Sequence, residues 1–145
     1  MSATAPVRAR SRRATFRLRQ PVLPEHALQR QAADTCRIEF GPPGKLCPGG
    51  VVWYAIDMAG YTGTVPGTRV GRGCCAGVLD FFFLYRGAGH FAEQKRIDGS
   101  LSAEQMVMCS ALLLSGGKVG VFDDAEALLR LTDAWGIPRA RRTLL

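Results

Sequence analysis

With 145 residues, of which 47% are hydrophobic, the chain is long enough to bury a real core, and its length predicts one domain. No apolar run in the sequence approaches the ~20 residues that span a bilayer, so we expect no membrane segment. The five cysteines lack C-x-x-C spacing, which favours reduced thiols over a zinc site. No signal-peptide core is visible, so a cytoplasmic location is expected.

The formal net charge of +7 is concentrated at the two ends of the chain. All 12 acidic residues lie between Glu25 and Asp133, where they slightly outnumber the basic ones. Residues 1–20 contain no acid and are expected to form a disordered arm, and residues 139–145 form a basic tail. Such segments suit phosphate backbones, because released counterions drive binding; a solvated tail or an organelle-targeting segment is the alternative. The candidate nucleic-acid contacts of the arm are Arg8, Arg10, Arg12, Arg13, Arg17 and Arg19.

The first predicted helix begins near Pro24 and runs to about Glu39, because proline is tolerated in the first turn. Its buried stripe is predicted at Leu28, Ala32 and Cys36, which recur every four residues. Glu25 lies three residues before Leu28, so it shares this stripe and is expected to face the sheet. The alternative role for Glu25 is an N-terminal acid that complements the helix dipole.

Three strands are predicted next, at residues 51–56, 80–86 and 90–96, with a turn around residues 87–89. Residues 60–77 contain six glycines and are predicted to form a loop, in which Arg69 and Arg72 either contact phosphates or remain solvated. Residues 81–85 are apolar on both faces, as is typical of a central strand between two layers of helices.

A second helix is predicted from Ser102, where Ser102 and Gln105 match a capping box. This helix is expected to end at residues 116–117, before a fourth strand at residues 118–122. Asp123 or Asp124 would cap a last helix, which Gly136 and Pro138 would end. The expected order is αβββαβα, a small mixed β-sheet flanked by helices.

Asp80, Glu93 and Lys95 form the candidate site, because they lie on strands that are otherwise among the most apolar in the chain. Glu93 and Lys95 share one strand face and Gln94 points to the other. Asp80 joins them only if the turn between the strands contains an even number of residues or a bulge. Two carboxylates beside an ammonium can bind Mg²⁺ or Mn²⁺, with Lys95 orienting the attacking water. The alternative is an ordinary surface triad on a hairpin.

The chain resembles the VRR-NUC family of PD-(D/E)XK nucleases over residues 21–138. The resemblance begins with the Pro24-Glu25-His26-Ala27-Leu28-Gln29 segment and continues through Asp80, Glu93 and Lys95. It extends over the Gly99-Ser100-Leu101-Ser102-Ala103-Glu104-Gln105 segment and closes with Ala134-Trp135-Gly136-Ile137-Pro138. It implies an α/β, restriction-endonuclease-like core.

The resemblance also implies roles for residues that the pattern alone leaves open. Glu25 would supply an active-site carboxylate, the backbone carbonyl of Gln94 would bind the metal, and Gln105 would lie near it. Two departures are that Leu79 stands where relatives usually carry proline, and that the glycine-rich loop replaces a short basic helix.

The expected function is a Mg²⁺-dependent DNA endonuclease, and by analogy a homodimer that acts on branched DNA. The alternatives are a catalytically impaired nuclease-fold module that only binds nucleic acid, and an unrelated α/β interaction protein.

Overall fold

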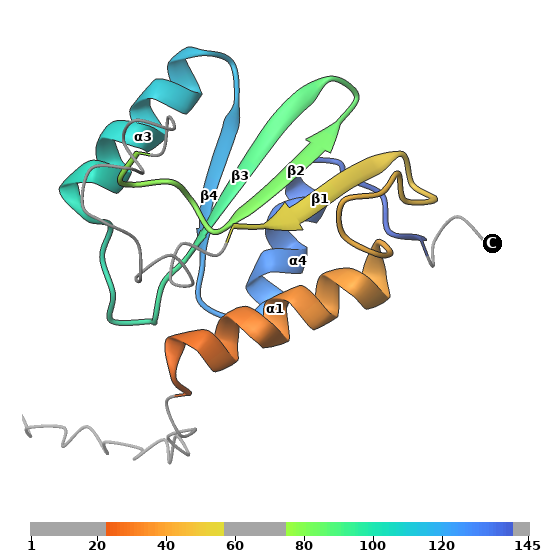
Figure 1. The fold of residues 1–145 in the computed structure, drawn as a ribbon, viewed down its shortest axis with the longest axis horizontal. Helices are drawn as coiled ribbons and strands as arrows, with labels where there is room; N and C mark the ends of the chain where they lie inside the picture. The colour runs from red at the N-terminus through yellow and green to blue at the C-terminus, as the bar shows by residue number, and fades with distance from the viewer. Residues whose placement is uncertain (1–22, 57–74, 141–145) are drawn as a thin grey trace, which may run out of the picture.

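The computed structural model describes residues 23–56 and 75–140 (Figure 1). Within these residues the elements are α1 (Glu25–Glu39), β1 (Val51–Ala55), β2 (Phe81–Tyr85), β3 (Ala88–Gln94), α3 (Ala103–Leu114), β4 (Lys118–Phe122) and α4 (Ala125–Ala134). The described chain is therefore α/β, with a mixed four-stranded sheet and three helices. Over the residues that the structure describes, the expected αβββαβα order is confirmed. None of the described helices combines the length and apolar character that a membrane crossing requires.

The sheet has the strand order β1-β2-β3-β4. The first three strands pair antiparallel, and β4 pairs parallel to β3. Parallel neighbours need a crossover connection, and α3 supplies it on one side of the sheet. Helices α1 and α4 lie on the opposite side (Figure 1). The sheet thus has two different faces, which we call the α1/α4 face and the α3 face.

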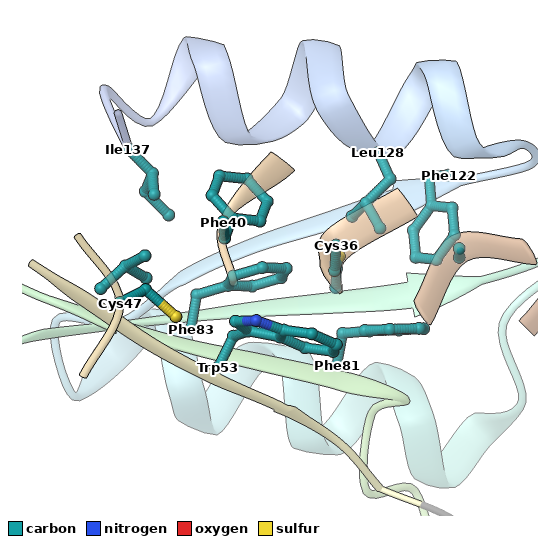
Figure 2. Close-up of a cluster of buried hydrophobic side chains, with 12 residues drawn as sticks. Cys36, Phe40, Cys47, Trp53, Phe81, Phe83, Phe122, Leu128 and Ile137 are labelled. Atoms are coloured by element: carbon teal, nitrogen blue, oxygen red, sulfur yellow. The ribbon is translucent and has the colours of Figure 1, made fainter. Parts of the chain in front are cut away.

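The hydrophobic core lies between the α1/α4 face and its two helices, as Figure 2 shows. Alternate residues of β1 and β2 point into it, because side chains on a strand alternate between faces. The ring centroids of Phe40, at the end of α1, and Phe83 are 5.8 Å apart. Ala32 and Cys36 of the predicted α1 stripe are fully buried, whereas Leu28 is half-buried. The large buried side chains include Trp53, Phe40, Phe81, Phe83, Leu128 and Ile137.

The hairpin between β2 and β3 turns one residue earlier than the glycines suggested. Tyr85 pairs with Ala88, so Arg86 and Gly87 form a two-residue turn. Both have positive φ, 50° and 74°, which matches the twist of a tight hairpin. The even turn length is confirmed, but the predicted strand at residues 90–96 is wrong at both ends, because β3 begins at Ala88 and ends at Gln94.

The helix ends follow the sequence signals closely. Ser102 and Gln105 form the complete capping box of α3, and the Asp124 side chain accepts the Ala127 N–H at the start of α4. After α4, Gly136 has φ 75°, and the Ile137 N–H donates to the Thr132 carbonyl at 3.1 Å. This backbone reversal ends α4 where Gly136 predicts it.

The prediction of helices over both faces of β2 is only partly right. On the α3 face, Tyr54 is 42% exposed and Leu84 is 41% exposed. The apolar run at residues 81–85 therefore does not mark a strand that is buried throughout. Helix α3 lies beside β3 and β4, whose crossover it forms, and leaves this part of β1 and β2 open to solvent.

Candidate metal centre

Asp80 immediately precedes β2, in the position across from Glu93 of β3. Phe81 pairs with Ala92, so the next antiparallel pair is Asp80 with Glu93, and both lie on the α3 face. The Asp80 Oδ2 atom accepts the Gln94 N–H at 2.9 Å. This hydrogen bond holds the Asp80 carboxylate against β3, just beyond the last backbone pair between β2 and β3.

Glu93 is 1% exposed, and its two carboxylate oxygens have different surroundings. Its Oε1 atom lies 2.8 Å from the Lys95 ammonium and also accepts a hydrogen bond from the Gln105 Nε2. Its Oε2 atom is buried and has no hydrogen-bond partner among the described residues. An unpaired buried carboxylate oxygen is costly, so this atom is suited to a cation that would approach it.

Lys95 follows Gln94 at the end of β3 and brings its ammonium back to the α3 face. Its backbone N–H donates to the Phe122 carbonyl at 2.9 Å, which prolongs the pairing with β4 by one residue. Its side chain is 19% exposed, so the ammonium faces Glu93 on one side and remains reachable from solvent. The same charge can therefore face a phosphate.

Gln94 points to the α1/α4 face, as the strand alternation predicted. Its side chain is 1% exposed, and its Nε2 donates to the Glu25 carbonyl at 3.3 Å. This bond ties the first turn of α1 to the end of β3. The sequence gives no sign of this role of Gln94, because nothing local relates two residues that are 69 positions apart.

Glu25 itself is exposed at the first residue of α1, at the open end of the predicted stripe. Its negative charge still acts on Asp80, whose pKa it helps to raise. The structure thus brings Glu25 to the same end of the sheet as Asp80 and Glu93. Its carboxylate makes no close cluster with theirs.

Gln105 contacts Glu93 because the first turn of α3 packs closely against the segment that precedes β2. Gly77 packs so closely on this first turn that a Cβ at residue 77 would lie 2.4 Å from the Glu104 carbonyl oxygen. Gly77 also has φ +84°, which favours glycine. This close contact joins the segment that leads to Asp80 to the helix that carries Gln105.

The pKa of Asp80 is raised from 3.8 to about 6. Burial is the largest cause, the Gln94 N–H opposes it, and the negative charge of Glu93 adds to it. Lys95 lowers the pKa and Glu25 raises it further. The carboxylate is therefore held where its negative charge is poorly compensated, and a divalent cation would correct this.

The arrangement fits a Mg²⁺ or Mn²⁺ ion that binds few protein ligands. No group of three or more His, Cys, Asp or Glu side chains within residues 23–56 and 75–140 is arranged to bind a metal. Mg²⁺ usually keeps several waters and binds through one or two carboxylates. Asp80 and Glu93 meet this need, with the unpartnered Glu93 Oε2 as the observation that favours it.

The predicted nucleic-acid contacts Arg8, Arg10, Arg12, Arg13, Arg17, Arg19, Arg69 and Arg72 lie outside the described residues. Arg139 of the basic tail is described, and it forms ion pairs with Asp133 at 2.5 Å and with Glu39 at 3.8 Å. It therefore joins the end of α4 to the end of α1.

Comparison of the chain with protein-family models, curated proteins and solved structures found no match. The chemistry of this protein is therefore inferred from the residue pattern and from the geometry of Asp80, Glu93, Lys95 and Gln105.

Proposed function

We propose that the protein is a metal-dependent nuclease that hydrolyses phosphodiester bonds of DNA. The single observation that carries this proposal is the position of Asp80 one residue beyond the last β2–β3 pair, which places it beside Glu93, with the Lys95 ammonium 2.8 Å from Glu93. Two carboxylates and one ammonium at the end of a sheet suit a cation and a phosphate together. The strand order and the crossover helix support a restriction-endonuclease-like core, as the resemblance to the VRR-NUC family implies.

Asp80 and Glu93 would bind Mg²⁺ or Mn²⁺, with the Gln94 carbonyl as a further ligand and Glu25 reaching the ion through water. Such a cation lowers the pKa of a bound water and stabilises the charge that develops on the phosphate. Lys95 would offset the same developing charge and orient the attacking water. Gln105 Nε2 holds Glu93 Oε1, so Oε2 is the oxygen that would bind the cation.

The substrate and the assembly are further parts of the proposal. By analogy with compact nucleases, the protein would act as a homodimer on branched DNA. The alternative function is a module that binds nucleic acid without cleaving it. The loss of proline before Asp80 favours this alternative, because Leu79 gives the chain more freedom at that point.

The test is incubation of the full chain with plasmid and with four-way-junction DNA, in Mg²⁺ and in chelator. Wild-type protein should cleave only with Mg²⁺, and Asp80→Asn should lose cleavage by at least about 100-fold while still binding DNA. Asp34→Asn is the matched control, because Asp34 pairs with Arg37 on the exposed side of α1. Binding without cleavage by the wild type would select the alternative, and neither activity would overturn both.

A further inference from the structure

A row of three aromatic side chains crosses the sheet on the α3 face. Tyr54 of β1 pairs with Phe82 of β2, and Phe82 pairs with Phe91 of β3. The ring centroids of Tyr54 and Phe82 are 5.0 Å apart, and those of Phe82 and Phe91 are 5.1 Å apart. We call Tyr54, Phe82 and Phe91 the aromatic row.

The aromatic row is not part of the buried core. Tyr54 is 42% exposed and the other two rings are half-buried, whereas Trp53, which follows the alternation to the opposite face, is 1% exposed. Gly89 makes room for two of the rings, because a Cβ there would lie 3.0 Å from Phe91 Cε2 and 3.3 Å from Phe82 Cε2. These ring edges therefore lie directly over bare backbone. Aromatic rings that remain partly open to solvent are available for stacking.

The aromatic row continues the candidate metal centre along the same two strands. Phe82 lies two residues after Asp80, and Phe91 lies two residues before Glu93. Two residues of an antiparallel strand span about 6.8 Å, and nucleotides stack at about 3.4 Å each along one strand. A nucleic-acid strand with a phosphate at Asp80 and Glu93 would thus bring bases one or two nucleotides away over the row.

We propose that the aromatic row stacks the unpaired bases of the strand whose phosphate lies at Asp80 and Glu93. This inference rests on the proposed nuclease function and specifies its substrate as a strand with unpaired nucleotides beside the cleaved bond. Bases inside a duplex are stacked on each other and offer only their edges. Rings on a sheet stack instead on exposed base faces, without regard to sequence.

The test measures binding in chelator, so that no cleavage is needed. The full chain is titrated with single-stranded DNA of about 12 nucleotides, which carries one 2-aminopurine, and with an abasic strand of the same length. Tyr54→Ala should weaken binding of the base-bearing strand by between about fivefold and about 150-fold. It should leave the affinity for the abasic strand unchanged, because that strand offers no base to stack. The slope of log K against log salt should also stay the same, because stacking releases no counterions.

Two variants serve as controls for this measurement. Tyr54→Phe keeps the ring and should bind the base-bearing strand as the wild type does. Ile38→Ala removes an α1 side chain that is 57% exposed, and it should change the binding of neither DNA strand. Quenching of 2-aminopurine fluorescence on binding should persist in Tyr54→Phe and diminish in Tyr54→Ala.

Equal weakening of both strands by Tyr54→Ala, or no weakening of either, would overturn the stacking site. So would a wild-type dimer that Tyr54→Ala converts to monomer, as sedimentation would show, with DNA binding unchanged; the face would then be an interface between two copies. The nuclease function is tested separately by cleavage in Mg²⁺. Base-dependent binding without cleavage would support stacking on the aromatic row and contradict the nuclease function. Cleavage without base-dependent binding would support the nuclease function and contradict stacking on the aromatic row.

Discussion

Both polar atoms of the Gln105 side-chain amide form hydrogen bonds, and one of these bonds is to Glu93. Its Oε1 atom accepts the backbone N–H of Ser102 at 2.9 Å, which completes the capping box of α3. Its Nε2 donates to Glu93 Oε1. The start of α3 and the candidate metal centre therefore share one amide group, and variants can separate its two roles.

Gln105→Glu keeps a side chain that can form the capping box but places a second carboxylate against Glu93. We expect nuclease activity to fall by at least about tenfold, because the two like charges would disturb the ligand geometry. Ser102→Ala should cost about 0.5–2 kcal/mol of folding free energy and retain activity per folded molecule, since the Ser102 backbone N–H is unchanged. Urea denaturation and cleavage assays measure the two effects. Equal activity in Gln105→Glu and wild type would contradict a role at the metal centre.

Asp80 predicts a specific pH dependence of stability in metal-free protein. Its folded-state pKa of about 6 exceeds the ordinary 3.8, so between these values the folded state binds a proton that the unfolded state has released. Stability should therefore fall as pH rises from about 4 to about 6, by on the order of 1–2 kcal/mol after allowance for solvent screening.

The measurement is urea denaturation at several pH values in chelator, for wild type and Asp80→Asn. The variant cannot titrate at this position, so the stability difference between the two proteins should grow in favour of the variant across this window. A difference that stays constant from pH 4 to pH 6 would show that the Asp80 carboxyl titrates normally.

Gly77→Ala should destabilise the protein by about 2–5 kcal/mol, because it adds backbone strain and a clash with the Glu104 carbonyl. Gly116→Ala is the matched control, since Gly116 has φ +90° and open space around its Cβ position. The control should lose only the strain contribution, about 1 kcal/mol. Losses of the same size in denaturation experiments would mean that the segment before Asp80 does not pack firmly on α3.

Deletion of residues 1–20 removes six arginines from a chain whose acidic residues all lie further along. DNA affinity should fall, and the slope of log K against log salt should become shallower by up to about 5, because fewer counterions are released. Single-turnover cleavage at saturating DNA should change little. A full-length variant with the same arginines changed to glutamine should reproduce the effect, and an unaltered salt slope would show that the arm does not contact DNA.

Local signals in the sequence were enough to predict the order of the elements and the ends of most of them. Ser102, Asp124 and Gly136 mark helix ends through bonds within one turn of the chain, so these positions can be recognised without tertiary information. The shared face of Asp80 and Glu93 followed from strand alternation once the turn length was even. The position of the turn did not follow, because Gly87 and Gly89 both suit it and Arg86 adopts a positive φ that its residue type does not predict.

Only the tertiary structure decided what surrounds these residues. The bonds from Gln105 to Glu93 and from Gln94 to the Glu25 carbonyl join separate elements, and they depend on how α3 and α1 pack on the sheet. Residues 81–85 are apolar throughout, yet Leu84 is 41% exposed, since the crossover helix lies over β3 and β4 and not over this part of β1 and β2. Alternation in the sequence determines which side chains share a face. How much of that face is covered depends on where distant helices lie.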